Sequence, residues 1–131
     1  MCRKTCLSLF LLVLLMLLTG CGSAQKRISG TDLPTMPRVT MTSSEIKSST
    51  RGVATDGKFL FTGPVYDALE RLRWISRPYL KAGWTPKQPA GSPSEATQVF
   101  SKPLPELKLK RSVKITAIAS QTKGSIVVHL Y

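Results

Sequence analysis

The sequence predicts an α+β domain, a small sheet of about four to five strands with one helix packed on it, preceded by a disordered tether. Three patterns carry this prediction. Residues 22–50 are rich in Ser, Thr, Lys, Gly and Pro and show no lasting periodicity. Residues 65–75 carry apolar side chains at helical spacing, and residues 113–131 alternate and then run apolar, as paired strands do.

The first pattern places a flexible tether over residues 21–51. A segment so poor in apolar side chains cannot bury enough surface to offset the entropy lost on ordering. The small α+β domain is then expected over residues 52–131. At its start, Asp56-Gly57 predicts the tight turn of a hairpin between two short strands, since both residues tolerate a positive φ.

The second pattern predicts a helix that starts after residues 62–64, where a threonine hydroxyl can cap it and a proline follows. Asp67 and Arg71, four residues apart, are expected to pair on its solvent side. Pro78 disfavours helical geometry at Arg77, so the predicted helix ends there. One face of the helix is apolar, with Val65, Ala68, Leu69, Leu72 and Ile75.

The remaining segments are predicted as a loop and a hairpin. Six prolines between residues 78 and 105 favour a loop with at most one short strand, at residues 97–100. Residues 113–120 alternate between apolar and polar side chains, residues 121–124 offer a turn, and residues 125–131 are almost wholly apolar. This pattern predicts a terminal hairpin whose last strand is central in the sheet.

The amino-terminal residues have the order of a secretory signal. Arg3 and Lys4 precede an apolar run of 12 residues from Leu7 to Leu18, which only Ser8 interrupts. A bilayer-spanning helix needs about 20 apolar residues, so a permanent transmembrane segment is disfavoured. The small residues that follow this run fit a cleavage site.

The residues Leu18-Thr19-Gly20-Cys21 resemble the lipobox of bacterial lipoprotein precursors. The resemblance implies that residues 1–20 are a signal peptide removed by signal peptidase II and that Cys21 carries the lipid. Gly22 stands where an aspartate favours retention in the inner membrane, so the resemblance implies the outer membrane, on its periplasmic side. The alternative is an ordinary signal, cleaved for instance after Ala24, with Cys21 incidental.

Cysteine usage and charge are consistent with export. All three cysteines lie at or before Cys21, so the mature chain is expected to form no disulfide. Without Arg3 and Lys4 it carries 17 basic and 7 acidic residues, a formal net charge of +10. Such a charge favours anionic partners in the envelope, such as lipid headgroups, lipopolysaccharide, peptidoglycan or an acidic protein, whereas nucleic acid is an unlikely partner. The alternative is that the charge serves solubility only.

No residue pattern indicates catalysis, a metal or a cofactor. His129 is the single histidine, and its place on a predicted strand favours an outward-facing side chain. No cysteine remains for a zinc site, no serine lies in a nucleophile elbow, and no glycine-rich phosphate loop is present. We therefore expect a protein that is not an enzyme.

Two clusters are candidates for partner binding. The basic ridge consists of Lys108, Lys110, Arg111 and Lys114, and Lys108 and Lys110 are expected on one strand face. Lysines also protect edge strands from aggregation, which is the alternative interpretation. The second cluster contains Trp74 and Trp84 beside several arginines, a composition typical of interaction hot spots. These aromatic residues equally suit the end of a small core.

The carboxy-terminal part resembles the DotD-type lipoproteins of type IVB secretion and related conjugation systems. The resemblance rests on residues 61–65, the helix after them and the final residues 127–131, although the prolines between Ser101 and Ser112 leave no room for that family's second helix. It implies a structural role in an outer-membrane complex. We therefore expect a non-enzymatic accessory or assembly component of an envelope apparatus, with binding of an anionic envelope polymer as the alternative.

Overall fold

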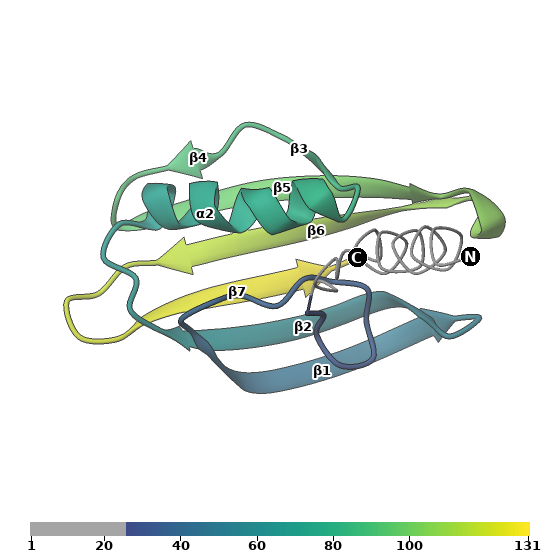
Figure 1. The fold of residues 1–131 in the computed structure, drawn as a ribbon, viewed down its shortest axis with the longest axis horizontal. Helices are drawn as coiled ribbons and strands as arrows, with labels where there is room; N and C mark the ends of the chain where they lie inside the picture. The colour runs from purple at the N-terminus through teal and green to yellow at the C-terminus, as the bar shows by residue number, and fades with distance from the viewer. Residues whose placement is uncertain (1–25) are drawn as a thin grey trace, which may run out of the picture.

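The computed structural model describes residues 26–131, so the predicted signal peptide and Cys21 lie outside the described residues. In this range seven strands form one antiparallel sheet, and the helix α2 (Ala68–Lys81) packs on it (Figure 1). The predicted class, a sheet with one helix on it, is confirmed, but the sheet has more than four to five strands. The strands are β1 (Thr40–Thr50), β2 (Val53–Gly63), β3 (Thr85–Pro86), β4 (Ala90–Gly91), β5 (Glu95–Leu104), β6 (Leu109–Ile118) and β7 (Gly124–Leu130).

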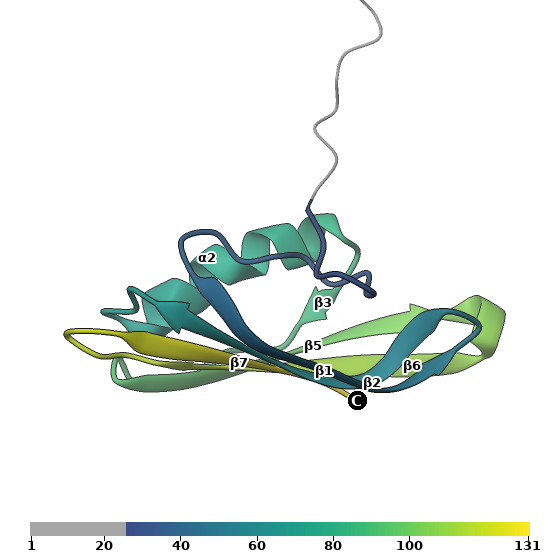
Figure 2. The same cartoon turned by 90° about the horizontal axis from the view of Figure 1, so that it is seen from below.

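The fold has two layers, and only one face of the sheet is covered. The strand order is β1-β2-β7-β6-β5-β3, and β4 also pairs with β5. Figure 2 shows α2 and the segment before β1 together on one side of the sheet, with no element on the other side. The core lies between these layers, where the strands contribute Phe59, Phe61, Phe100, Val113, Ile115, Ile126, Val128 and Leu130.

Residues 26–50, expected as part of a flexible tether, fold into the domain. Ile28, Leu33 and Met36 are buried in the common core, and the Ile28 amide donates to the Leu33 carbonyl at 2.8 Å. All side chains of β1 are exposed, so the sequence of this strand shows no alternation between apolar and polar residues. Main-chain hydrogen bonds to β2 hold β1 in the sheet. The expected boundary at residue 52 is therefore wrong, and the folded part includes Lys26.

The first hairpin turns at a different place from the predicted one. Its turn residues are Arg51 and Gly52, with φ of 52° and 77°, and both positive values suit a two-residue hairpin loop. Asp56 and Gly57 lie inside β2 instead. A side chain at Gly57 would come within 2.8 Å of the Glu45 carbonyl oxygen, so this glycine permits close approach of β1.

The helix begins and ends later than predicted. Asp67 is its N-cap, and its carboxylate accepts a hydrogen bond from the Glu70 amide at 3.0 Å. The expected stop at Pro78 does not occur, and the helix continues to Lys81. The last turn is anchored by Tyr79, which is wholly buried against Phe100 with ring centroids 4.9 Å apart.

The end of the chain follows the prediction closely. β6 and β7 form the predicted terminal hairpin, with Val113 opposite Leu130 and Ile118 opposite Ser125. β7 lies between β2 and β6 and is therefore central, as expected. In contrast, the segment expected as a loop contains the ten-residue strand β5, paired along its length with β6.

Candidate functional site

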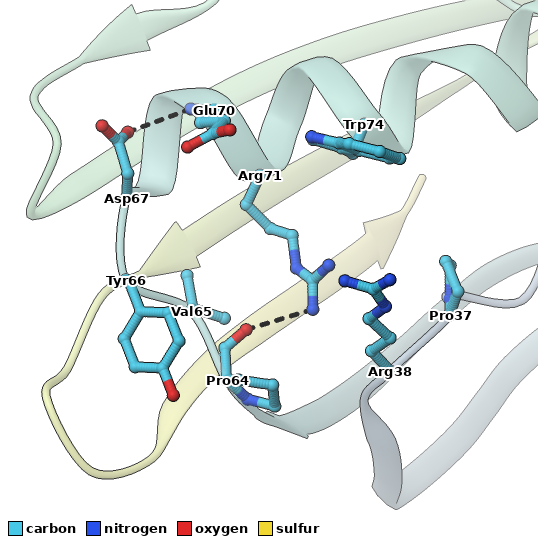
Figure 3. Close-up of a pocket in the computed structure, with 9 residues that line it drawn as sticks. All are labelled: Pro37, Arg38, Pro64, Val65, Tyr66, Asp67, Glu70, Arg71 and Trp74. Atoms are coloured by element: carbon cyan, nitrogen blue, oxygen red, sulfur yellow. Dashed lines mark hydrogen bonds between the residues drawn. The ribbon is translucent and has the colours of Figure 1, made fainter.

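A groove of about 430 Å³ lies between the start of α2 and the segment that leads into β1. It opens on the helix side of the molecule (Figure 3). Its lining combines two arginines, two carboxylates, an exposed tyrosine and an exposed tryptophan from two separate stretches of the chain. The lining residues are Pro37, Arg38, Pro64, Val65, Tyr66, Asp67, Glu70, Arg71 and Trp74.

Local geometry brings the two arginines together. Arg38 follows Pro37 in a turn and has a φ of 63°, and Arg71 lies in the first turns of α2. Gly63 allows the approach, because a Cβ there would lie 2.9 Å from the Arg38 carbonyl oxygen. The Arg71 Nη2 donates to the Pro64 carbonyl at 3.1 Å, which directs its guanidinium towards Arg38. Figure 3 shows the two guanidinium groups side by side.

Within the described part of the chain, neither guanidinium has a carboxylate partner. Among residues 26–131, the ion pairs join Asp32 to Arg111 and to Lys102 only. The Nε atom of Arg71 is buried and has no hydrogen-bond partner in the described part of the chain. Burial lowers the pKa of Arg71, and the neighbouring charge of Arg38 lowers it further. This end of the groove is therefore strongly electropositive.

The other parts of the groove are acidic and aromatic. Asp67 caps the helix, and Glu70 is exposed one turn away. Tyr66 and Trp74 stand on either side of Arg71 in Figure 3, and they are 73% and 53% exposed. Two converging guanidiniums beside aromatic rings form an arrangement suited to holding a phosphate or carboxylate group.

Comparisons with known protein families, curated proteins and solved structures find no match for this chain. Within residues 26–131, no three His, Cys, Asp or Glu side chains gather in a way that could hold a metal ion. In the same range, no helix is both long enough and apolar enough to cross a membrane.

Two of the residues predicted for partner binding are part of the core. Trp84 is 2% exposed and packs edge-on against Tyr79, with ring centroids 6.0 Å apart. Arg111 is 1% exposed, lies 5.2 Å from the Trp84 ring centroid and pairs with Asp32. The prediction that Trp84 and Arg111 form a partner-binding surface is therefore wrong, because both side chains are buried. Successive residues of β6 point to opposite faces of the sheet, and Arg111 points to the helix side.

The other residues of the predicted basic ridge, Lys108, Lys110 and Lys114, are exposed but do not form one continuous surface on β6. Lys108 precedes β6 in a left-handed conformation, with a φ of 50°, and so does not share a strand face with Lys110 as expected. Lys110 and Lys114 alternate with buried residues of β6, which places them on the uncovered side of the sheet. Trp74 remains exposed on α2, where the Arg77 guanidinium lies 5.1 Å from its ring centroid.

Sequence reasoning missed Arg38 and Arg71 as a pair. They are 33 positions apart, and Arg71 was expected to pair with Asp67 on the helix surface. The structure shows no such ion pair, because the Asp67 carboxylate caps the helix and Arg71 turns to Pro64. Pro37 was the one local signal of a turn that could present the basic side chain of Arg38.

The uncovered side of the sheet, here called the open face, is the second notable surface. His129 pairs with Lys58 on one neighbouring strand and with Lys114 on the other, which sets the three in one row across the sheet. His129 is exposed as expected, and its ring lies 5.3 Å from that of Tyr131. The face also carries Leu60, Thr97, Val99, Thr116, Ile118 and Val127.

Proposed function

We propose that the protein is a lipoprotein of the bacterial outer membrane, facing the periplasm, and that it is a non-enzymatic accessory or assembly component of an envelope complex. The lipobox resemblance at residues 18–21 supports the anchor on Cys21. A secretion or conjugation apparatus is the complex we favour, on the resemblance of the carboxy-terminal part to DotD-type lipoproteins.

The distance between anchor and domain supports a defined orientation. The step from Cys21 to Lys26 covers five residues, which span at most about 18 Å when fully extended. In Figure 2 the described chain starts beside α2, on the side opposite the open face. An anchor so close to the helix side turns the open face away from the membrane and towards the periplasm.

The observation that carries the docking role is the open face itself. No element of the described chain covers it, and its central row holds Lys58, His129 and Lys114. Apolar side chains such as Val127 and the half-exposed Ile118 and Tyr131 accompany these charges. An acidic patch on an envelope protein complements this surface in charge and in its apolar content.

The test has an anchor arm and a docking arm. Cys21→Ala should abolish palmitate labelling and release the protein from the outer-membrane fraction. Crosslinking in intact cells followed by detergent extraction should recover a stoichiometric partner with the wild-type chain. Retained palmitate label in the Cys21→Ala variant, or no stoichiometric partner, would contradict the corresponding arm.

The docking arm has a matched control. Reversal of Lys58 and Lys114 to glutamate should remove most of the recovered partner. Reversal of Arg51 and Lys123, two exposed basic residues in turns at the ends of strands, should leave it in place. Equal loss from both double variants would point to net charge instead of the open face.

A second candidate function is binding of an anionic envelope polymer, lipopolysaccharide or peptidoglycan, by the same basic row. It is favoured by the alignment of Lys58, His129 and Lys114 on adjacent strands, which places three basic residues in one row on the open face. This function predicts binding that falls steeply with salt. Docking of a folded partner through a face that also carries apolar groups should depend on salt less.

A further inference from the structure

We propose that the helix side of the domain lies against a phospholipid surface, with a headgroup phosphate held between Arg38 and Arg71. This inference rests on the lipid anchor proposed above, which brings that side to the membrane. It assigns a second contact to the protein, separate from the open face and on the opposite side of the sheet.

The groove has the chemistry of a phosphate site. Guanidinium groups present several N–H donors in a plane and bind phosphate oxygens in pairs. Arg38 and Arg71 face each other without a carboxylate between them, and the Nε of Arg71 has no hydrogen-bond partner among the described residues. An anion placed between them would offset their mutual repulsion.

The outer stripe of α2 has the composition of an interfacial helix. Its residues recur at spacings of three and four and all are exposed: Glu70, Arg73, Trp74, Arg77, Leu80 and Lys81. Trp74 and Leu80 are 53% and 52% exposed, so this stripe presents large apolar groups to its surroundings. Tryptophan and leucine among basic residues are typical of helices that lie in the headgroup region of a bilayer.

Charge over this side is positive in total. The groove and the outer stripe together hold five basic side chains, Arg38, Arg71, Arg73, Arg77 and Lys81, against two acidic ones, Asp67 and Glu70. The Asp67 carboxylate is directed to the helix amide of Glu70, away from the two arginines. The surface is therefore complementary to a phospholipid layer.

The position of the chain start favours a membrane over a protein partner on this side. The described chain starts on the helix side of the sheet, and Cys21 is only five residues before its first residue, Lys26. A partner of any size would have to enter between the domain and the bilayer to which the proposed anchor ties it. Phospholipid headgroups are already there.

The experiment uses the two tryptophans, of which only Trp74 is exposed. The full-length lipoprotein, extracted from envelopes, is reconstituted into vesicles of phosphatidylcholine and phosphatidylglycerol whose acyl chains carry bromine, a short-range quencher. Bromine should quench part of the tryptophan fluorescence in the wild-type protein. Trp74→Phe should remove that quenched part, because Trp84 is 2% exposed and lies in the core.

The arginine groove is tested by a matched pair of variants. Arg38→Gln with Arg71→Gln should reduce the quenching at least about twofold, since basic side chains near an anionic surface strengthen binding to it. Lys58→Gln with Lys114→Gln, which removes the same charge from the open face, should leave it unchanged. Unquenched Trp74 in the wild-type protein, or equal quenching in both double variants, would overturn the proposal. Circular dichroism checks that each variant is folded.

Failure of the anchor is distinguishable from failure of this contact. A protein that takes no palmitate label has no anchor, and its binding to phosphatidylglycerol vesicles is then measured by flotation. Salt-sensitive flotation that the Arg38→Gln, Arg71→Gln variant loses would support the phospholipid contact alone. No flotation of a folded, unlipidated protein, or flotation that persists in this variant, would overturn it.

Discussion

Arg111 and Asp32, 79 positions apart in the sequence, are joined by two parallel hydrogen bonds of 2.8 and 2.6 Å. The same guanidinium donates to the Ala54 carbonyl at 3.0 Å and lies over the Trp84 ring. A buried arginine thus ties the segment before β1 to the sheet. The charge that the sequence suggested for partner binding holds the amino-terminal segment in place instead.

Asp32→Asn should destabilise the domain. It leaves the Arg111 guanidinium, 1% exposed, without a charged partner, and breaking a buried pair in this way costs about 3–5 kcal/mol. We expect about 3 kcal/mol, near the lower end, because the Asp32 side chain is 23% exposed. Urea unfolding of the purified protein measures the loss.

The control for this prediction is Glu45→Gln on the exposed edge strand β1, which should change stability by less than about 0.5 kcal/mol. Hydrogen exchange at the Ile28 and Thr35 amides, both hydrogen-bonded within the segment, should accelerate in Asp32→Asn. Equal stability of the two variants would show that the ion pair is not what holds the segment.

The domain should lose stability in acid because Asp32 becomes protonated. Burial raises the pKa of Asp32, but the hydrogen bonds and charge of Arg111, with Lys102 adding to them, outweigh this effect, so the pKa lies below its usual value. The contribution of ionised Asp32 to the free energy of unfolding is complete above its unfolded-state pKa of about 3.9. It is lost as the pH falls through the lower pKa that Asp32 has in the folded state.

Asp32→Asn provides the readout for this pH dependence. The difference in unfolding free energy between wild type and variant should be constant from about pH 7 to about pH 5 and should shrink below about pH 4. A protonated Asp32 and an asparagine both leave Arg111 without a negative partner. A difference that stays constant into acid would assign the acid sensitivity to other carboxyls.

Replacing each of the two tryptophans by alanine should have very different effects on the free energy of unfolding. Trp84→Ala should cost about 3–5 kcal/mol, because it empties a space between Tyr79, Arg111 and Lys102 in the core. Trp74→Ala should change stability by no more than about 0.5 kcal/mol, since its ring is exposed. Thermal unfolding in detergent measures both, and similar losses would place Trp74 in the core as well.

Local patterns predicted the elements with a clear run of apolar side chains. The β6–β7 hairpin followed from alternation over residues 113–120 and the apolar run over residues 125–131, and Ala68, Leu72 and Ile75 are buried on the face that their spacing predicted. Strand β1 could not be predicted, because its side chains are all exposed and its stability comes from main-chain pairing with β2. Asp56-Gly57 is the better turn sequence, but strand pairing places the turn at Arg51-Gly52 instead.

The candidate site was less predictable than the fold. Contacts between Arg38 and Arg71, or between Asp32 and Arg111, join residues that no local period relates. The predicted basic ridge assumed that Lys108, Lys110 and Arg111 stay together. Lys108 lies before β6 in a left-handed conformation, and Lys110 and Arg111 point to opposite faces because successive residues of a strand alternate.

Gly63→Ala should widen the groove by pushing away the segment that carries Arg38. The added methyl would lie 2.9 Å from both the Arg38 carbonyl oxygen and the Val39 Cγ1, closer than such atoms pack. The segment before β1 must then move away from β2, at a cost of about 1–3 kcal/mol. Because this movement carries Arg38 away from Arg71, the variant should also lose the quenching of Trp74 on bromine-labelled vesicles.

Gly52→Ala separates this effect from the general cost of an added methyl. Its Cβ would meet no atom within 4 Å. The only cost to stability is therefore that of an alanine at a φ of 77° in the first hairpin turn, about 1 kcal/mol. It should therefore lose some stability but keep the quenching of Trp74. If Gly63→Ala keeps full quenching while losing stability, the position of Arg38 does not govern the membrane contact, and Arg71 with the outer stripe of α2 must suffice.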